Sequence, residues 1–96
     1  MAIPDILPEK PGKIIAVHVA FESRAAQRGR RPKQPSYFLK ATSTLAASGS
    51  EVERPAGTEL LAFEGEIALI IGKSARNVSL ADAWDYVGYV TASNDL

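Results

Sequence analysis

Residues 60–71, LLAFEGEIALII, constrain the fold more than any other part of the chain. Their apolar and β-branched composition, followed by Gly72, is typical of a β-strand. Because side chains alternate between the two faces of a strand, Glu64 and Glu66 point to one face and the odd-numbered apolar residues to the other. The sequence therefore predicts a fold built around a β-sheet, with two carboxylates close together on one face.

The other predicted elements are short. Four further short strands are predicted from apolar or β-branched residues next to Gly, Pro or polar residues. They are residues 13–19 (buried), 37–40, 51–54 (an edge strand) and 88–92. The predicted helices are marked by capping signals: residues 23–28, ended by Gly29, and residues 80–86, preceded by the capping-box-like pair Ser79 and Asp82. These elements indicate a mixed β, or α+β, fold class.

Composition excludes several classes of function. The chain has 96 residues, enough for one small domain, and its 11 basic residues balance its 11 acidic residues. This balance argues against nucleic-acid partners and anionic membranes, which attract a basic excess. Without cysteine, the chain has no zinc–thiolate site, disulfide or cysteine nucleophile. Residues 1–12 contain three prolines and are expected to form an irregular lead-in, not a signal peptide, so we expect a cytoplasmic protein.

The two glutamates allow two interpretations. Carboxylates two residues apart repel each other, and a hard divalent cation such as Mg²⁺ would offset that repulsion. A solvated sheet face would offset it as well, and many strands have one such face. Spacing alone favours the solvated face, so the choice depends on the surrounding motifs.

Those motifs resemble one enzyme family. PSYFLKATSTL is followed by an acid-x-acid strand ending in IGK, by an Ala–Trp helix and by a strand ending in T-x-x-N-D. This order is similar to the core of the fumarylacetoacetate hydrolase family over residues 13–96. The resemblance implies a β-sandwich or β-roll with short helices. It also implies that Glu64, Glu66 and Asp95 bind Mg²⁺, Mn²⁺ or Ca²⁺.

The resemblance also implies a chemistry. Family members use the metal to stabilise an enolate of a small oxo-dicarboxylic acid or acylpyruvate, and they hydrolyse, decarboxylate or isomerise it. Residues 13–32 look most like the 2-hydroxyhepta-2,4-diene-1,7-dioate and 5-carboxymethyl-2-hydroxymuconate isomerase branch, which serves aromatic compound catabolism. Against that family, residues 13–96 read as a partial catalytic domain whose C-terminal part is absent. We expect a homo-oligomer, commonly a dimer, or a complementing chain.

One departure from the family pattern concerns hydrolysis. Arg24 and Gln27 stand where hydrolytic members carry a His–Glu dyad that activates water. Arginine stays protonated and cannot act as a general base, which favours isomerase or decarboxylase chemistry. Arg24 is a candidate clamp for a substrate carboxylate, or else a solvated helix residue. Lys40 is a candidate for binding anionic substrate, or an exposed residue at a strand end, and His18 is expected to be structural.

The departure leaves a second hypothesis open. A truncated or degenerate homologue would keep the acidic strand and act as an assembly or interaction module without catalysis. The replaced dyad and the short chain both favour this alternative.

Overall fold

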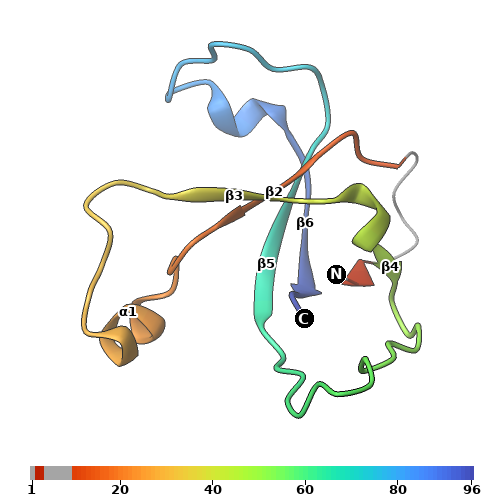
Figure 1. Ribbon diagram of the computed structural model, residues 1–96. Helices are drawn as coiled ribbons and strands as arrows, with labels where there is room; N and C mark the ends of the chain where they lie inside the picture. Colours follow the sequence, from red (N-terminus) through yellow and green to blue (C-terminus); the bar gives the residue numbers. More distant parts are fainter. Residues whose placement is uncertain (1, 4–9) are drawn as a thin grey trace. The chain divides into compact units, whose positions relative to one another are not determined.

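The computed structural model describes residues 2–3 and 10–96, which divide into two compact units. Figure 1 labels their elements. The first unit contains β1 (Ala2–Ile3), β4 (Ala46–Ala47), β5 (Gly65–Ile71), the 3₁₀ helix η2 (Ala83–Tyr86) and β6 (Val87–Asn94). The second unit contains β2 (Ile14–Val17), α1 (Glu22–Arg28), β3 (Tyr37–Lys40) and the 3₁₀ helix η1 (Thr42–Thr44). Short two-stranded sheets and few helices agree with the predicted mixed class.

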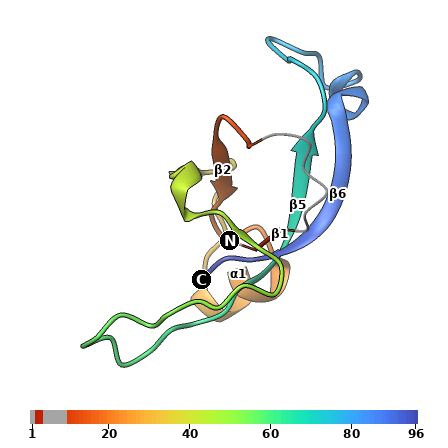
Figure 2. The same cartoon turned by 90° about the vertical axis from the view of Figure 1, so that its right-hand side faces the viewer.

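The antiparallel pair β5–β6 is the longest pairing of the first unit, and Figure 2 shows β6 curving alongside β5. The register runs from Gly65 opposite Asn94 to Ile71 opposite Val87. Between Ile70 and Ile71 the register shifts, so Gly88 is an extra residue in β6, as in a β-bulge. The bulge lies against Gly72, where a Cβ atom would come within 2.9 Å of the Gly88 Cα atom. Two glycines therefore permit the close backbone approach at this end of the two-stranded β5–β6 ribbon.

The strand of residues 60–71 is shorter than predicted, because β5 begins at Gly65. Residues 51–64 form an irregular connection, so the predicted edge strand over residues 51–54 is wrong. The Thr58 N–H donates to the Pro55 carbonyl at 3.1 Å, and Gly57 has φ +84°, so the chain turns here. The partner of β5, strand β6, ends at Asn94. Residues 60–63 therefore have no strand neighbour in the described register.

The second unit contains the hairpin-like pair β2–β3 and the helix α1. Strand β3 has the predicted bounds, and β2 is shorter than the predicted residues 13–19. The prediction that β2 is buried is wrong, because Ile15 and Val17 are exposed in the structure. Helix α1 ends as predicted at Gly29, which has φ 68° and whose N–H contacts the Ala26 carbonyl at 3.2 Å.

Two local predictions are refined. Residues 2–3 form β1, parallel to β4, where an irregular lead-in was expected, and residues 4–9 lie outside the described part. The predicted helix over residues 80–86 is the shorter η2, whose N-cap is Asp82 instead of Ser79, and the two residues contact each other in the turn before it. Ser79 Oγ donates to Asp82 Oδ2 at 2.7 Å, and Asp82 N–H donates to Ser79 Oγ at 3.2 Å. In the described residues, no helix is both long and apolar enough to cross a membrane.

We predict that Gly88→Ala destabilises the first unit. Its Cβ atom would lie 3.0 Å from the Gly72 Cα atom, and backbone atoms cannot move aside as a side chain can. Overpacking of this kind costs about 1–3 kcal/mol. Urea unfolding followed by circular dichroism measures the loss. Gly65→Ala, where nothing lies within 4 Å of the added Cβ atom, is the control in the same ribbon. Equal midpoints for the two variants would show that the close approach is unimportant.

Candidate functional site

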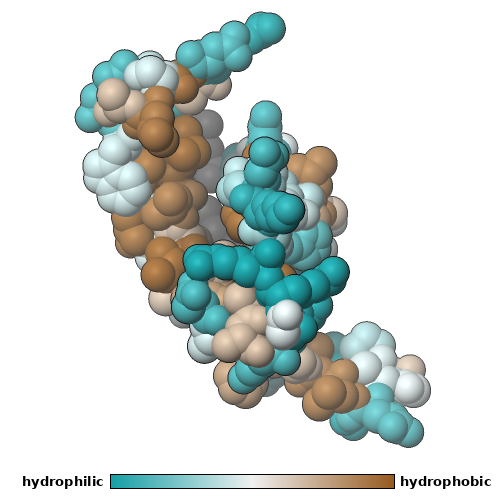
Figure 3. All heavy atoms as spheres, turned by 90° about the vertical axis from the view of Figure 1, so that its left-hand side faces the viewer, coloured by the Kyte–Doolittle hydropathy of each residue, from teal (hydrophilic) through white to brown (hydrophobic). Residues whose placement is uncertain are grey.

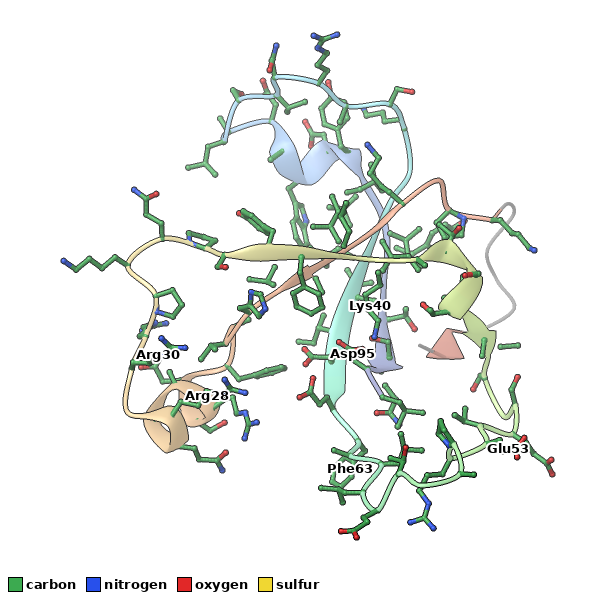
Figure 4. The ribbon with its side chains drawn as sticks, in the orientation of Figure 1. Arg28, Arg30, Lys40, Glu53, Phe63 and Asp95 are labelled. Atoms are coloured by element: carbon green, nitrogen blue, oxygen red, sulfur yellow. The ribbon has the colours of Figure 1, made fainter. Side chains whose placement is uncertain are left out.

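The register of β5 and β6 places the predicted acidic residues together. Glu66 lies directly opposite Ser93, and the Asp95 N–H donates to the Glu64 carbonyl at 2.8 Å one step beyond the paired strands. Residues opposite each other in an antiparallel pair project to the same face, with Cβ atoms about 4.5–5.5 Å apart. Glu64, Glu66 and Asp95 therefore belong to one face at one end of the ribbon. Figure 4 shows Asp95 at this end of β6.

The backbone of Glu64 is held from both sides by the Asn–Asp pair. Its carbonyl accepts from the Asp95 N–H at 2.8 Å, and its N–H donates to Asn94 Oδ1 at 2.9 Å. Asn94 thus closes the open end of the ribbon with its side chain, whereas Asp95 belongs to the carboxylate face. In the N-D motif, the Asn94 side chain therefore binds the backbone, and the Asp95 side chain belongs to the carboxylate face.

The carboxylate face is the more covered face of β5. Glu66, Ala68 and Ile70 are half-buried, whereas Ile67, Leu69 and Ile71 on the opposite face are exposed. Burial raises the pKa of Glu66 above its ordinary value of 4.5, and the nearby Glu64 carboxylate raises it further. Glu64 itself is exposed. The interpretation of a fully solvated acidic face therefore fits Glu64 better than it fits Glu66.

Ser93 is a polar residue of this face that the sequence interpretation did not single out. It is buried, and its Oγ atom has no hydrogen-bond partner. Its position two residues before Asp95 on the same strand was the available signal, because residues i and i+2 share a face.

The donor chemistry of this face fits a hard divalent cation, since Mg²⁺ and Ca²⁺ prefer oxygen ligands from carboxylates, completed by water. In the described part of the chain, however, no three His, Cys, Asp or Glu side chains form a ready-made metal cluster. The backbone places the three carboxylates on one face, but their side chains do not converge into a closed site. The metal ligands therefore stay a prediction.

The other candidate residues belong to the second unit. Arg24 Nη1 donates to Gln27 Oε1 at 3.0 Å along the exposed surface of α1, so the two residues at the dyad positions contact each other. Lys40 is the half-buried last residue of β3. Whether Arg24 and Lys40 bind substrate stays a prediction.

His18 follows β2 instead of lying within it, and its side chain has structural contacts. Its Nδ1 atom lies 3.1 Å from Ser36 Oγ, and its ring packs on Phe38 with centroids 4.5 Å apart. These contacts are those of a residue that links β2 to the segment before β3.

Comparison with known proteins decides the family. The family model "Fumarylacetoacetate (FAA) hydrolase C-terminal" matches residues 13–96. The chain belongs to the fumarylacetoacetate hydrolase family. The resemblance predicted over residues 13–96 is thereby confirmed.

Several curated relatives are similar to most of the chain. A homoprotocatechuate catabolism bifunctional isomerase/decarboxylase of Escherichia coli is 39% identical over 90 residues, which are 93% of this chain and 21% of the relative. A mitochondrial oxaloacetate tautomerase of Arabidopsis thaliana is 36% identical over 85 residues, 88% of this chain and 38% of the relative. The chain thus spans a minor part of the length of these relatives. No solved structure matches the fold significantly.

We predict that Glu66 makes the metal-free protein less stable as the pH rises. Because the pKa of Glu66 is raised in the folded state, the folded protein binds this proton more tightly than the unfolded chain does. The resulting stability is complete below the ordinary pKa of 4.5 and is lost as the pH rises through the raised value. Glu66→Gln should remove this part of the pH dependence. Urea midpoints in EDTA between pH 4 and pH 7 measure it, and parallel profiles for both proteins would contradict the assignment.

Proposed function

We propose that this chain is part of a divalent-metal-dependent enzyme that isomerises, decarboxylates or hydrolyses small oxo-dicarboxylic acids or acylpyruvates. The observation that carries the proposal is the register of β5 and β6, which assigns Glu64, Glu66 and Asp95 to one face. Membership of the fumarylacetoacetate hydrolase family supports it. The Mg²⁺, Mn²⁺ or Ca²⁺ ion expected here would supply Lewis-acid polarisation of the oxo groups.

The chain's own residues would bind and position the reactants. The carboxylates of Glu64, Glu66 and Asp95 would hold the ion, and Glu66 would give up the proton that its raised pKa favours in the empty site. The backbone contacts between Glu64 and the Asn94–Asp95 pair would hold two of the three ligands in register. Lys40 and Arg24 are the candidate partners for the carboxylates of an anionic substrate.

Isomerisation or decarboxylation is favoured over hydrolysis. In the structure Arg24 contacts Gln27, and neither guanidinium nor amide can take a proton from water at ordinary pH. The similar proteins from Escherichia coli and Arabidopsis thaliana are named as an isomerase/decarboxylase and an oxaloacetate tautomerase. Both names denote reactions that can proceed without a water nucleophile. These relatives give no support to the alternative of an assembly module without catalysis.

The proposal extends to partners, architecture and location. Figure 3 shows hydrophobic side chains gathered on the molecular surface. On β5 the exposed fractions of Ile67 and Ile71 are 67% and 58%, which is unusual for a face that stays in water. This exposure supports the expected homo-oligomer or complementing chain, within a β-sandwich or β-roll. A cytoplasmic location remains part of the proposal.

For the metal, we predict saturable Mn²⁺ binding that Glu66→Gln weakens by at least about tenfold. Loss of groups that only support a metal ligand already costs 10–100-fold in affinity, so loss of a ligand should cost no less. Isothermal titration calorimetry measures the affinity, and the rate of oxaloacetate enol–keto conversion with Mn²⁺ should fall in parallel.

Glu53→Gln is the matched control, because Glu53 is an exposed acid in the irregular connection before β5 (Figure 4). It should bind Mn²⁺ as the unchanged protein does. A folded protein that binds no Mn²⁺, or one in which both variants bind equally well, would rule out the proposed site.

For assembly, we predict that the protein sediments as a dimer or larger species. The exposed apolar side chains of β5 would be buried between copies, because removal of apolar surface from water is favourable. Ile67→Lys should shift the equilibrium towards the monomer by placing a charge on this face. Sedimentation velocity at several concentrations tests it, and a monomer at all concentrations would leave only the complementing chain.

A further inference from the structure

Ser93 has an unexplained property for a residue on a short ribbon. Only 8% of it is exposed, and its Oγ atom has no hydrogen-bond partner. Buried polar side chains are nearly always paired, because an unmade hydrogen bond costs the full desolvation of the hydroxyl group. Among the buried side-chain oxygen and nitrogen atoms of the described residues, Ser93 Oγ is the one without a hydrogen-bond partner. The hydroxyl therefore has no partner among the described residues, and a group outside them is needed to satisfy it.

The hydroxyl is directed to the carboxylate face. Ser93 is directly opposite Glu66 in the register and two residues before Asp95. Both relationships place its side chain on the same face as the carboxylates. The next pair on that face, Thr91 opposite Ala68, carries no carboxylate, so the acidic part of the face ends at Glu66 and Ser93. Ser93 therefore lies at the inner edge of the acidic end of the β5–β6 ribbon.

We propose that Ser93 is a further binding residue of this site, whose Oγ atom accepts a hydrogen bond from a water molecule on the bound divalent cation. The inference rests on the proposed function, since it requires an ion at Glu64, Glu66 and Asp95. Small divalent cations bound by few carboxylates keep several waters, and each such water has hydrogens to donate. A serine oxygen has lone pairs to accept one of them. The hydroxyl then gains in the loaded state the partner that it lacks in the empty one.

The test compares Mn²⁺ affinity with stability in the absence of metal. Ser93→Ala should weaken Mn²⁺ binding about fivefold in calorimetric titration, the effect of one ordinary hydrogen bond. In EDTA the same variant should unfold at the same temperature as the unchanged protein or higher, because it removes an unpaired buried hydroxyl. Ser74→Ala, an exposed serine in the connection after β5, is the control and should change neither value.

The outcomes separate the two proposals. If the unchanged protein binds no Mn²⁺, or if Glu66→Gln binds it normally, the proposed metal site fails and the role of Ser93 fails with it. If Glu66→Gln loses affinity but Ser93→Ala does not, only the role of Ser93 is overturned. An earlier unfolding of Ser93→Ala in EDTA would also overturn it, because the hydroxyl would then stabilise the empty protein.

Discussion

The antiparallel pairing of β5 with β6 is the interaction on which the candidate site depends. A slip of one residue would turn every side chain of one strand to the other face, and Ser93 and Asp95 would leave the face of Glu66. The register is held at both ends. At one end Gly72 and Gly88 approach closely, and the Gly72 N–H donates to the Tyr86 carbonyl at 2.8 Å. At the other end the Asn–Asp pair holds the backbone of Glu64.

The same pairing sets the electrostatics of the acidic face. Strand alternation places Glu64 and Glu66 on the same face. Burial of Glu66 and the nearby Glu64 carboxylate both raise the pKa of Glu66. Without a positive charge the face is an unfavourable arrangement, since burial and a neighbouring like charge both oppose ionisation. This cost and the unpaired buried hydroxyl beside the carboxylates support the proposed binding site.

The small sheets bury little apolar surface. Among the described residues, Ala25 is the one hydrophobic residue that is buried. Large hydrophobic side chains on β5, β6 and β3 remain exposed. Two-stranded ribbons are marginally stable in water, and the exposed apolar faces support the proposed oligomer or complementing chain. The similar enzymes are much longer than this chain, which spans 21% to 38% of two of them.

The sequence by itself determined the features that depend on neighbours along the chain. Alternation placed Glu64 and Glu66 on one face, Gly29 marked the end of α1, and the order of motifs identified the family. These signals are local because a strand period, a left-handed glycine and a motif need no distant partner.

The tertiary structure alone decided which residues meet across the strands. It brought Ser93 opposite Glu66, began β5 at Gly65, opposite the last residue of β6, and made the acidic face more covered than the apolar one. None of these follows from the sequence pattern, because register and burial depend on pairing between residues 16 to 29 positions apart. The family resemblance named the carboxylates, but only the pairing of β5 with β6 showed that they share a face with a buried, unpaired hydroxyl.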